Sequence, residues 1–291
     1  MKTDLKGLDA AGIEKWVLRE GLEPYRARQI RHWVFKRLAG SFHEMHNLPK
    51  PLRESLDARI SLCPLVKVET VLSEDGTEKS LFRLQDGHHI ESVLIPERDH
   101  ATLCVSTQAG CAMGCLFCLT GGSGLKRNLT AGGKGEQVIQ GKRSMNTPEA
   151  LTNVVFMGMG EPLANYDAVR TAVMNLVDED GMNFSHRRVT LSTCGLVPQM
   201  AQMGRDMKIN LAVSLNAADD STRSRLMPVN RTYPLAQLIA ACRAFPLPNR
   251  RMITFEYILV GGMNDRRVDA EKLAALLSGL RAKINLIPLN A

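Results

Sequence analysis

The chain has 291 residues, of which 44% are apolar and 23% charged, a balance typical of a globular protein with a substantial core. No run of eighteen apolar residues occurs, and the N-terminal segment mixes acidic and basic residues, so we expect neither a transmembrane helix nor a secretory signal, but a cytoplasmic protein with no membrane partner. The formal net charge of +7 favours polyanionic partners over cationic ones.

The first sixty residues show helical patterns. Amphipathic stretches occupy 12–20 and 25–38, and a third begins beyond Pro51. The second stretch is strongly basic, because it carries Lys or Arg at five positions from Arg26 to Arg37 and no acid. Such a run fits a solvated helix face and an RNA-facing patch equally well. We predict a small helical domain that resembles an RNA-binding module over residues 1–60.

Residues 61–100 change to the shorter period of β-strands. Three strand candidates follow one another, separated by the turn signals Glu74-Asp75-Gly76 and Asp86-Gly87. Their sequences are VKVETVL, KSLFRL and HIESVLIP. The pattern predicts a short antiparallel β meander that links the helical domain to the rest of the chain.

From residue 101 strands and helices alternate. The strand candidates are ATLCVST, TNVVFMG, RRVTLST, INLAVSL, MITFEYILV and KINLIPL. Alternation of this kind indicates a parallel sheet with right-handed crossovers, and six units are too few to close an eightfold barrel. We therefore predict an α/β fold with a partial (β/α)6 barrel over residues 101–291, whose chemistry lies at the carboxyl ends of the strands.

Three cysteines, Cys111, Cys115 and Cys118, follow the first barrel strand. The chain has seven cysteines, and an odd number without an export signal argues for metal or redox chemistry over a disulfide scaffold. Three thiolates can hold three irons of a [4Fe–4S] cluster and leave the fourth open to the amino and carboxylate groups of S-adenosylmethionine. A structural zinc site would need a fourth Cys or His nearby. The triplet predicts an iron–sulfur cluster used for radical chemistry on S-adenosylmethionine.

The Cys-x3-Cys-x2-Cys spacing, with an aromatic residue before the last cysteine, resembles the radical S-adenosylmethionine superfamily. The segments CVSTQAGCAMGCLFCLTGGSGLKRNL, VVFMGMGEPLANYDAV, VTLSTCGL, LAVSLNA and INLIPLN resemble, more narrowly, the adenine-C2 methyltransferases of 23S ribosomal RNA and transfer RNA. The match runs almost from end to end. It implies a radical methyltransferase with a [4Fe–4S] cluster and S-adenosylmethionine as cofactors, 23S rRNA and tRNA as partners, an external electron donor and a monomeric state.

The resemblance also assigns residues to the cofactor. Gly160 and Glu161 belong to a Gly-Glu-Pro segment that holds the methionyl ammonium in the family. Further positions that match cofactor contacts are Ser192, Ser214, Leu215, Asn216 and Asn290, although the family commonly has His where Asn216 stands. By residue type alone, Glu161 would be a surface glutamate in a turn, and the others would be ordinary strand-end residues.

Two residues match catalytic positions of the family. Glu91 matches the proton acceptor of the methylation, and Cys104 matches the thiol that resolves the protein–RNA intermediate by forming a disulfide with a methyl-carrier cysteine. By residue type alone, Glu91 would be a solvated strand carboxylate and Cys104 a small buried strand residue.

The chain departs from the family pattern in two places. The carrier cysteine belongs to a segment beyond LIPLN, and the sequence stops at Ala291; neither Cys194 nor Cys242 has its context. We therefore expect a truncated member that binds the cluster and the cofactor but does not complete methyl transfer. The adenine-C8 methyltransferases of the antibiotic-resistance class share these motifs, and a catalytically inactive RNA-binding fragment is a third hypothesis.

The second departure is the glycine-rich segment Gly132-Gly133-Lys134-Gly135, where the family usually begins a helix. Each glycine inside a helix costs roughly 1 kcal/mol relative to alanine. We expect the helix to begin later, near Glu136, or the segment to be altered, with local disorder near the cysteine loop.

Overall fold

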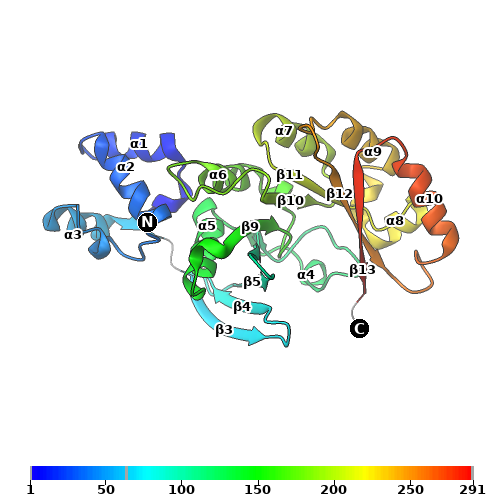
Figure 1. The fold of residues 1–291 in the computed structure, drawn as a ribbon, viewed down its shortest axis with the longest axis horizontal. Helices are drawn as coiled ribbons and strands as arrows, with labels where there is room; N and C mark the ends of the chain where they lie inside the picture. The colour runs from blue at the N-terminus through cyan, green and yellow to red at the C-terminus, as the bar shows by residue number, and fades with distance from the viewer. Residues whose placement is uncertain (1, 63–64, 290–291) are drawn as a thin grey trace. The chain divides into compact units, whose positions relative to one another are not determined.

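The computed structural model describes residues 2–62 and 65–289 (Figure 1). The chain forms two compact units. Unit 1 comprises Met1–Ser106, Asn128–Gly158 and Asp167–Val189, and unit 2 comprises Thr107–Arg127, Met159–Tyr166 and Thr190–Ala291. Within the described ranges, no helix has both the length and the apolar character needed to cross a membrane. The division into three parts expected from the sequence stays a prediction.

Unit 1 begins with the three predicted helices. They are α1 (Ala10–Arg19), α2 (Tyr25–Arg31), which continues as the π-helix η2 (His32–Lys36), and α3 (Lys50–Arg59). Asp9 caps α1, since its Oδ1 accepts a hydrogen bond from the Gly12 amide at 2.8 Å. The short strands β1 (Thr3–Asp4) and β2 (Ile60–Ser61) pair in parallel and bring the two ends of this helical segment together.

The predicted meander is confirmed in unit 1. Strands β3 (Val66–Leu72), β4 (Glu78–Arg83) and β5 (His89–Pro96) pair antiparallel in succession. Strand β5 then pairs antiparallel with β6 (Ala101–Cys104), and β6 pairs in parallel with β9 (Leu151–Phe156). The meander thus continues directly into the first two barrel strands.

Helix α5 (Ala131–Ser144) corrects the expectation for the glycine-rich segment. The helix begins at Ala131 and not near Glu136, and Thr130 caps it by accepting a hydrogen bond from the Gly133 amide at 3.0 Å. A Cβ atom at Gly132 would lie 2.3 Å from Oδ2 of Asp4. Glycine is therefore the residue that lets β1 approach the first turn of α5, and this contact outweighs the low helix propensity.

Lys134 lies in the same turn and is buried, with its ammonium donating to the Leu129 carbonyl at 2.7 Å. Desolvation lowers the pKa of Lys134 to about 7. Below pH 7 Lys134 is charged in both the folded and the unfolded protein, so the folded state carries the full cost of a buried charge. Above pH 7 the folded protein loses this proton while the unfolded chain still keeps it, so the free energy of unfolding rises with pH. We expect Lys134→Met to stabilise the protein at pH 7 and below by about 1 to 3 kcal/mol, and urea unfolding across pH would measure this.

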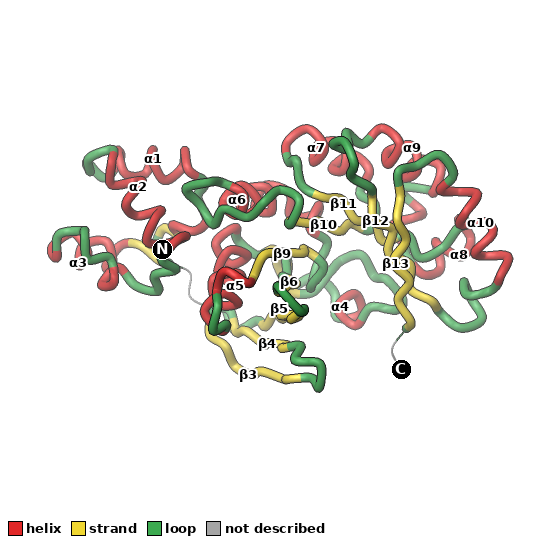
Figure 2. The backbone as a smooth tube through the Cα atoms, in the orientation of Figure 1, coloured by secondary structure: helices red, strands yellow, loops and turns green. Residues whose placement is uncertain are grey.

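Unit 2 holds the remaining predicted barrel strands. Strands β10 (Val189–Thr193), β11 (Asn210–Ser214), β12 (Ile253–Leu259) and β13 (Ala282–Pro288) pair in parallel in chain order. Leu191, Leu211, Val213 and Phe255 on these strands are fully buried. Figure 1 shows α7, α9 and α10 arranged around the strands, and Figure 2 separates the strands from the loops that follow them.

All six barrel strands predicted from the sequence are thus present, two in unit 1 and four in unit 2. The other helices are α4 (Leu119–Gly122), α6 (Tyr166–Val177), α7 (Val197–Asp206), α8 (Asp220–Leu226), α9 (Leu235–Ala244) and α10 (Arg267–Leu277). The short elements are β7 (Gln108–Ala109), β8 (Arg127–Asn128), η1 (Leu5–Gly7), η3 (Phe42–Glu44), η4 (Pro148–Ala150), η5 (Pro162–Asn165) and η6 (Pro228–Arg231).

Candidate active site

The cysteine triplet lies in unit 2, in a loop that begins after β7 and ends at α4. The loop curls back on itself, because the Cys111 amide donates to the Gly124 carbonyl at 3.2 Å and the Cys118 amide to the Cys115 carbonyl at 3.1 Å. Gly110 has a φ of +75°, and a Cβ there would lie 1.9 Å from the Gly124 carbonyl oxygen. Only glycine fits this turn.

The three thiols influence one another electrostatically. Burial, and then the neighbouring Cys118 and Cys111, raises the pKa of Cys115 to about 12. Burial likewise raises the pKa of Cys111, with smaller contributions from neighbouring charges that include Cys118. The raised pKa values favour the protonated thiols of Cys111 and Cys115 without a metal, and a cationic centre that binds all three cysteines as thiolates would relieve their mutual repulsion.

The loop provides an apolar wall for such a centre. Cys115, Met113 and Phe117 pack against the buried residues Cys194, Leu226 and Met227. Among the residues that the structure describes, no three His, Cys, Asp or Glu side chains are arranged to hold a single metal ion. A cubane needs no such convergence, because each thiolate binds a different iron. Three neighbouring thiols beside an apolar wall fit a [4Fe–4S] cluster.

Gly160 and Glu161 follow β9 and belong to unit 2. Gly160 has a φ of +96°, and a Cβ there would lie 2.5 Å from the Gln108 side chain. The carboxylate of Glu161 is buried and accepts hydrogen bonds from the Leu163 amide at 2.9 Å and the Cys194 amide at 2.8 Å. Glu161 therefore binds the chain itself, joining its own segment to the residue after β10, and burial raises its pKa against these hydrogen bonds.

The predicted cofactor contacts Ser192, Ser214, Leu215 and Asn216 all lie at the carboxyl ends of β10 and β11 in unit 2. Asn216 has a φ of +59°, a conformation that Asn tolerates better than most residues. Its side-chain oxygen accepts from the Ile258 amide at 2.9 Å, so its amide group already bridges to β12. The structure brings these four predicted residues together on one edge of the sheet.

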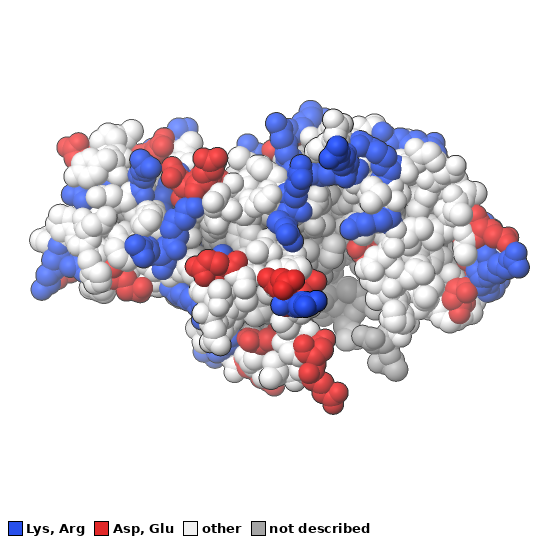
Figure 3. Space-filling view, viewed as in Figure 1, with Lys and Arg blue, Asp and Glu red and all other residues white. Residues whose placement is uncertain are grey.

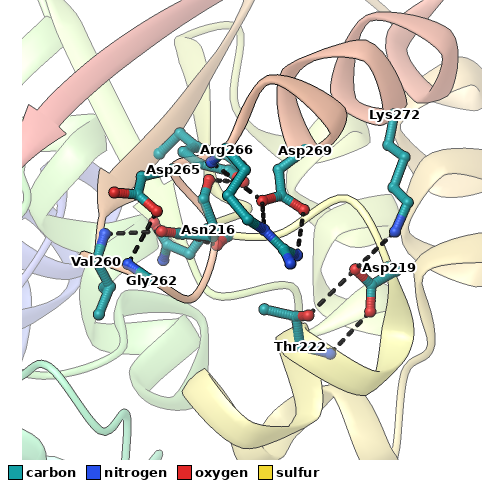
Figure 4. A network of polar contacts seen from close by, with 11 residues as sticks. Asn216, Asp219, Thr222, Val260, Gly262, Asp265, Arg266, Asp269 and Lys272 are labelled. Carbon is teal, nitrogen blue, oxygen red and sulfur yellow. Dashed lines mark hydrogen bonds and ion pairs between the residues drawn. The ribbon is translucent and has the colours of Figure 1, made fainter.

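A loop after β12 secures this edge. Asn264 donates to the Asn216 carbonyl and to the Ile258 carbonyl, both at 2.7 Å, and accepts from the Val260 amide at 2.7 Å. Figure 4 shows the surrounding polar contacts, in which Arg266 pairs with Asp269 at 2.9 Å. Asn264 was not singled out from the sequence, because nothing in the segment MND distinguishes it from a turn residue.

Arg223 is the second residue that sequence reasoning missed. Its side chain is fully buried in unit 2 and makes four hydrogen bonds. The guanidinium donates to the carbonyls of Cys194 (2.8 Å), Ser214 (3.1 Å) and Leu215 (3.0 Å) and to Oδ1 of Asn230 (2.9 Å). Arg223 therefore clamps the segments after β10 and β11 together. In the sequence it is one of several bases in a polar helix, and no local signal marks it as buried.

Glu91 and Cys104 lie in unit 1 on the paired strands β5 and β6. Cys104 pairs with Val93, which places Glu91 and Cys104 as diagonal neighbours on one face of the ladder. The Glu91 side chain is 43% exposed and lies 3.5 Å from the ammonium of Lys79. Burial raises the pKa of Cys104 to about 11. Asn290 lies outside the described residues.

Comparison with known proteins accounts for nearly the whole chain. Residues 3–62 match the ribosomal RNA large subunit methyltransferase N-terminal domain, and residues 105–274 match the radical SAM superfamily. A dual-specificity RNA methyltransferase RlmN of Desulfosudis oleivorans is 52% identical over 99% of this chain and 78% of its own length. The RlmN of Geobacter sulfurreducens is 53% identical over 99% of this chain and 79% of its own length.

A solved structure gives the same result for the fold. The crystal structure of a radical SAM methyltransferase from Sphaerobacter thermophilus superposes with a TM-score of 0.94 at 49% sequence identity. The superposition covers 99% of this chain and 86% of the other. The predicted α/β fold, with its helical N-terminal part and radical SAM strands, is confirmed.

Proposed function

The chain belongs to the family of dual-specificity RNA methyltransferases RlmN, and we propose that it adds a methyl group to C2 of adenine in 23S ribosomal RNA and transfer RNA. The observation that carries this proposal is the loop of Cys111, Cys115 and Cys118 in the same compact unit as the predicted cofactor contacts. Radical SAM enzymes of this family use a [4Fe–4S] cluster and S-adenosylmethionine. The family supports this function over the adenine-C8 class and over an inactive RNA-binding fragment.

We propose that the three cysteines hold the cluster and that the segment Gly160–Glu161 receives the ammonium of S-adenosylmethionine. When bound, the cluster and the cofactor supply the radical chemistry that an unreactive aromatic carbon requires. Both carboxylate oxygens of Glu161 accept hydrogen bonds from backbone amides of the chain. The carboxylate would therefore attract the ammonium through its negative electrostatic potential, and it also holds its own segment against Cys194. The other proposed contacts are Ser192, Ser214, Leu215, Asn216 and Asn290.

We propose Glu91 as the acceptor of the adenine C2 proton and Cys104 as the thiol that resolves the protein–RNA intermediate. The half-exposed carboxylate of Glu91, which lies 3.5 Å from the ammonium of Lys79, is accessible enough to suit a proton acceptor. The raised pKa of Cys104 means that this thiol must lose its proton before it can attack, and a carboxylate diagonal to it on the next strand is suitably placed to assist. We further propose a cytoplasmic monomer that receives its electron from an external donor.

Anaerobic reconstitution with iron and sulfide tests the function. The loaded protein is incubated with reductant, S-adenosylmethionine and unmodified rRNA or tRNA transcripts, and the small molecules and nucleosides are quantified by mass spectrometry. We expect 5′-deoxyadenosine that depends on both the cluster and the reductant. Any methylated adenosine should be 2-methyladenosine, and its formation by this chain alone would overturn the expectation that methyl transfer is not completed. Formation of 8-methyladenosine would assign the protein to the C8 class, and RNA binding without 5′-deoxyadenosine would make it non-catalytic.

A further inference from the structure

A hollow of about 450 Å³ opens within unit 1, and the residues that line it include none of those assigned to the reaction above. Three separate segments line it: the end of η2, the stretch from α5 to the start of β9, and the loop before β10. Its volume lies in the range of natural small-molecule sites, about 300 to 1,000 Å³. The hollow is therefore large enough for a group the size of a nucleotide.

The walls of the hollow are fixed to one another by buried or local contacts. Arg31 of α2 pairs with Asp178 at 2.7 Å, and the Asp178 carboxylate also accepts from the Gly181 amide at 3.0 Å. The Asp178 carbonyl accepts from the amide of Asn183, which lines the hollow. Arg143 at the end of α5 donates to the carbonyl of Leu38, which follows η2. The hollow thus exists before any ligand arrives.

The lining separates into an apolar floor and a cationic rim. Phe35, Leu151 and Phe184 are buried and form the floor. The Lys36 and Arg188 side chains are exposed at the rim, whereas Lys142 lies deeper.

Lys142 lies between the apolar floor and the cationic rim of the hollow. Its ammonium lies 5.0 Å from the centre of the Phe184 ring and 3.2 Å from the Pro148 carbonyl, and burial lowers its pKa. Thr152 also lines the hollow and is half-buried. An apolar floor and a cationic rim match a ligand that is flat and apolar on one side and anionic on the other.

We propose that this hollow binds an unstacked nucleotide of the RNA substrate other than the target adenine, with the base on the apolar floor and the adjoining phosphates on Lys36, Lys142 and Arg188. Proteins bind single-stranded RNA in this way, with bases on aromatic rings and phosphates on a basic groove. The inference rests on the proposed function, because it assumes an RNA substrate.

The hollow also divides the basic run of 25–38 into two roles. Arg31 is buried in its ion pair with Asp178 and serves the fold, whereas Lys36 is exposed at the rim of the hollow. Arg31 therefore fits neither of the alternatives left open by the sequence, a solvated face or an RNA-facing patch, and only exposed residues such as Lys36 are candidates for the RNA-facing patch. The acidic residue Glu149 also lines the hollow, so the charges of the lining are mixed and not uniformly basic.

The test compares the double variant Lys36→Glu, Arg188→Glu with the wild type in binding an unmodified tRNA transcript over a range of salt concentrations. Each lost phosphate contact reduces the salt slope by about 0.7 for single strands, so we expect a slope shallower by about 1.4. We expect the dissociation constant to rise at least about tenfold at moderate salt. Lys142→Met, which keeps the apolar stem on Phe184, is expected to weaken binding in the same direction.

The matched control is Arg205→Glu, Arg243→Glu, which makes the same charge change on exposed arginines of α7 and α9, where Figure 3 shows many Lys and Arg side chains. We expect this pair to change affinity less than twofold. If the control lost as much RNA affinity as the hollow variants, the effect would come from net charge alone and the inference would be overturned. Unchanged RNA affinity in the hollow variants would overturn it as well. Tighter binding of a polyglutamate peptide than of RNA would assign the hollow to an acidic protein. A wild type that binds no RNA at all would refute the proposed function itself.

Discussion

Replacing Cys115 by alanine is expected to abolish the cluster and leave the fold intact. Two thiolates cannot hold the three protein-bound irons of the cubane, so iron and sulfide content and 5′-deoxyadenosine formation should fall to background. The metal-free fold should change by only about 1 kcal/mol, because the thiol is neutral and its raised pKa brings no stabilising charge. Iron analysis and urea unfolding of the same preparations measure the two effects separately.

Cys242→Ala is the matched control for this prediction. Cys242 is buried in α9, and burial raises its pKa to about 12, as in Cys115. The two thiols therefore have the same protonation and differ in position, since Cys242 lies in a helix and not in the cysteine loop. We expect Cys242→Ala to keep the wild-type iron content. Loss of iron in both variants, or in neither, would contradict the assignment of the cluster to the loop.

The strand pattern and the cysteine loop could be predicted from the sequence because both are local. The six barrel strands are short β-rich segments bounded by turns, and the Cys111–Cys118 spacing fixes three thiols within one loop whatever surrounds it. The same holds for the strand-end positions Ser192 and Ser214, which follow once each strand is placed.

The features that escaped prediction depend on contacts between distant segments. Helix propensity argued against a helix at Gly132, but the Asp4 side chain, 128 positions earlier in the chain, occupies the space that a Cβ would need. The resemblance assigns Asn216 and Glu161 to the cofactor, but nothing in the sequence showed that their side chains also bind neighbouring backbone. Local sequence does not show which carbonyl or amide will lie opposite a given side chain, and in this site those partners decide the role.

Arg223→Met is expected to have the second large effect, on both the fold and the cofactor site. It removes the three guanidinium hydrogen bonds to the carbonyls of Cys194, Ser214 and Leu215, and hydrogen bonds from a charged donor are worth more than neutral ones. We expect a loss of about 3 to 5 kcal/mol in the free energy of unfolding, as for other buried charged groups that lose their partners. The affinity of the reconstituted protein for S-adenosylmethionine should fall at least about tenfold, because two strand ends lose their clamp.

The charge of Arg223 gives this prediction a test that stability alone does not provide. The guanidinium is close enough to lower the pKa of Cys115, so its positive charge also favours the reduced, more negative cluster. In Arg223→Met the cluster's reduction potential should therefore become more negative. Arg223→Lys keeps the positive charge but not the planar set of hydrogen-bond donors, so its reduction potential should be closer to that of the wild type than its free energy of unfolding is. Arg225→Met, an exposed arginine on the same helix, is the control and should change neither. An unchanged potential in Arg223→Met would restrict Arg223 to the clamp.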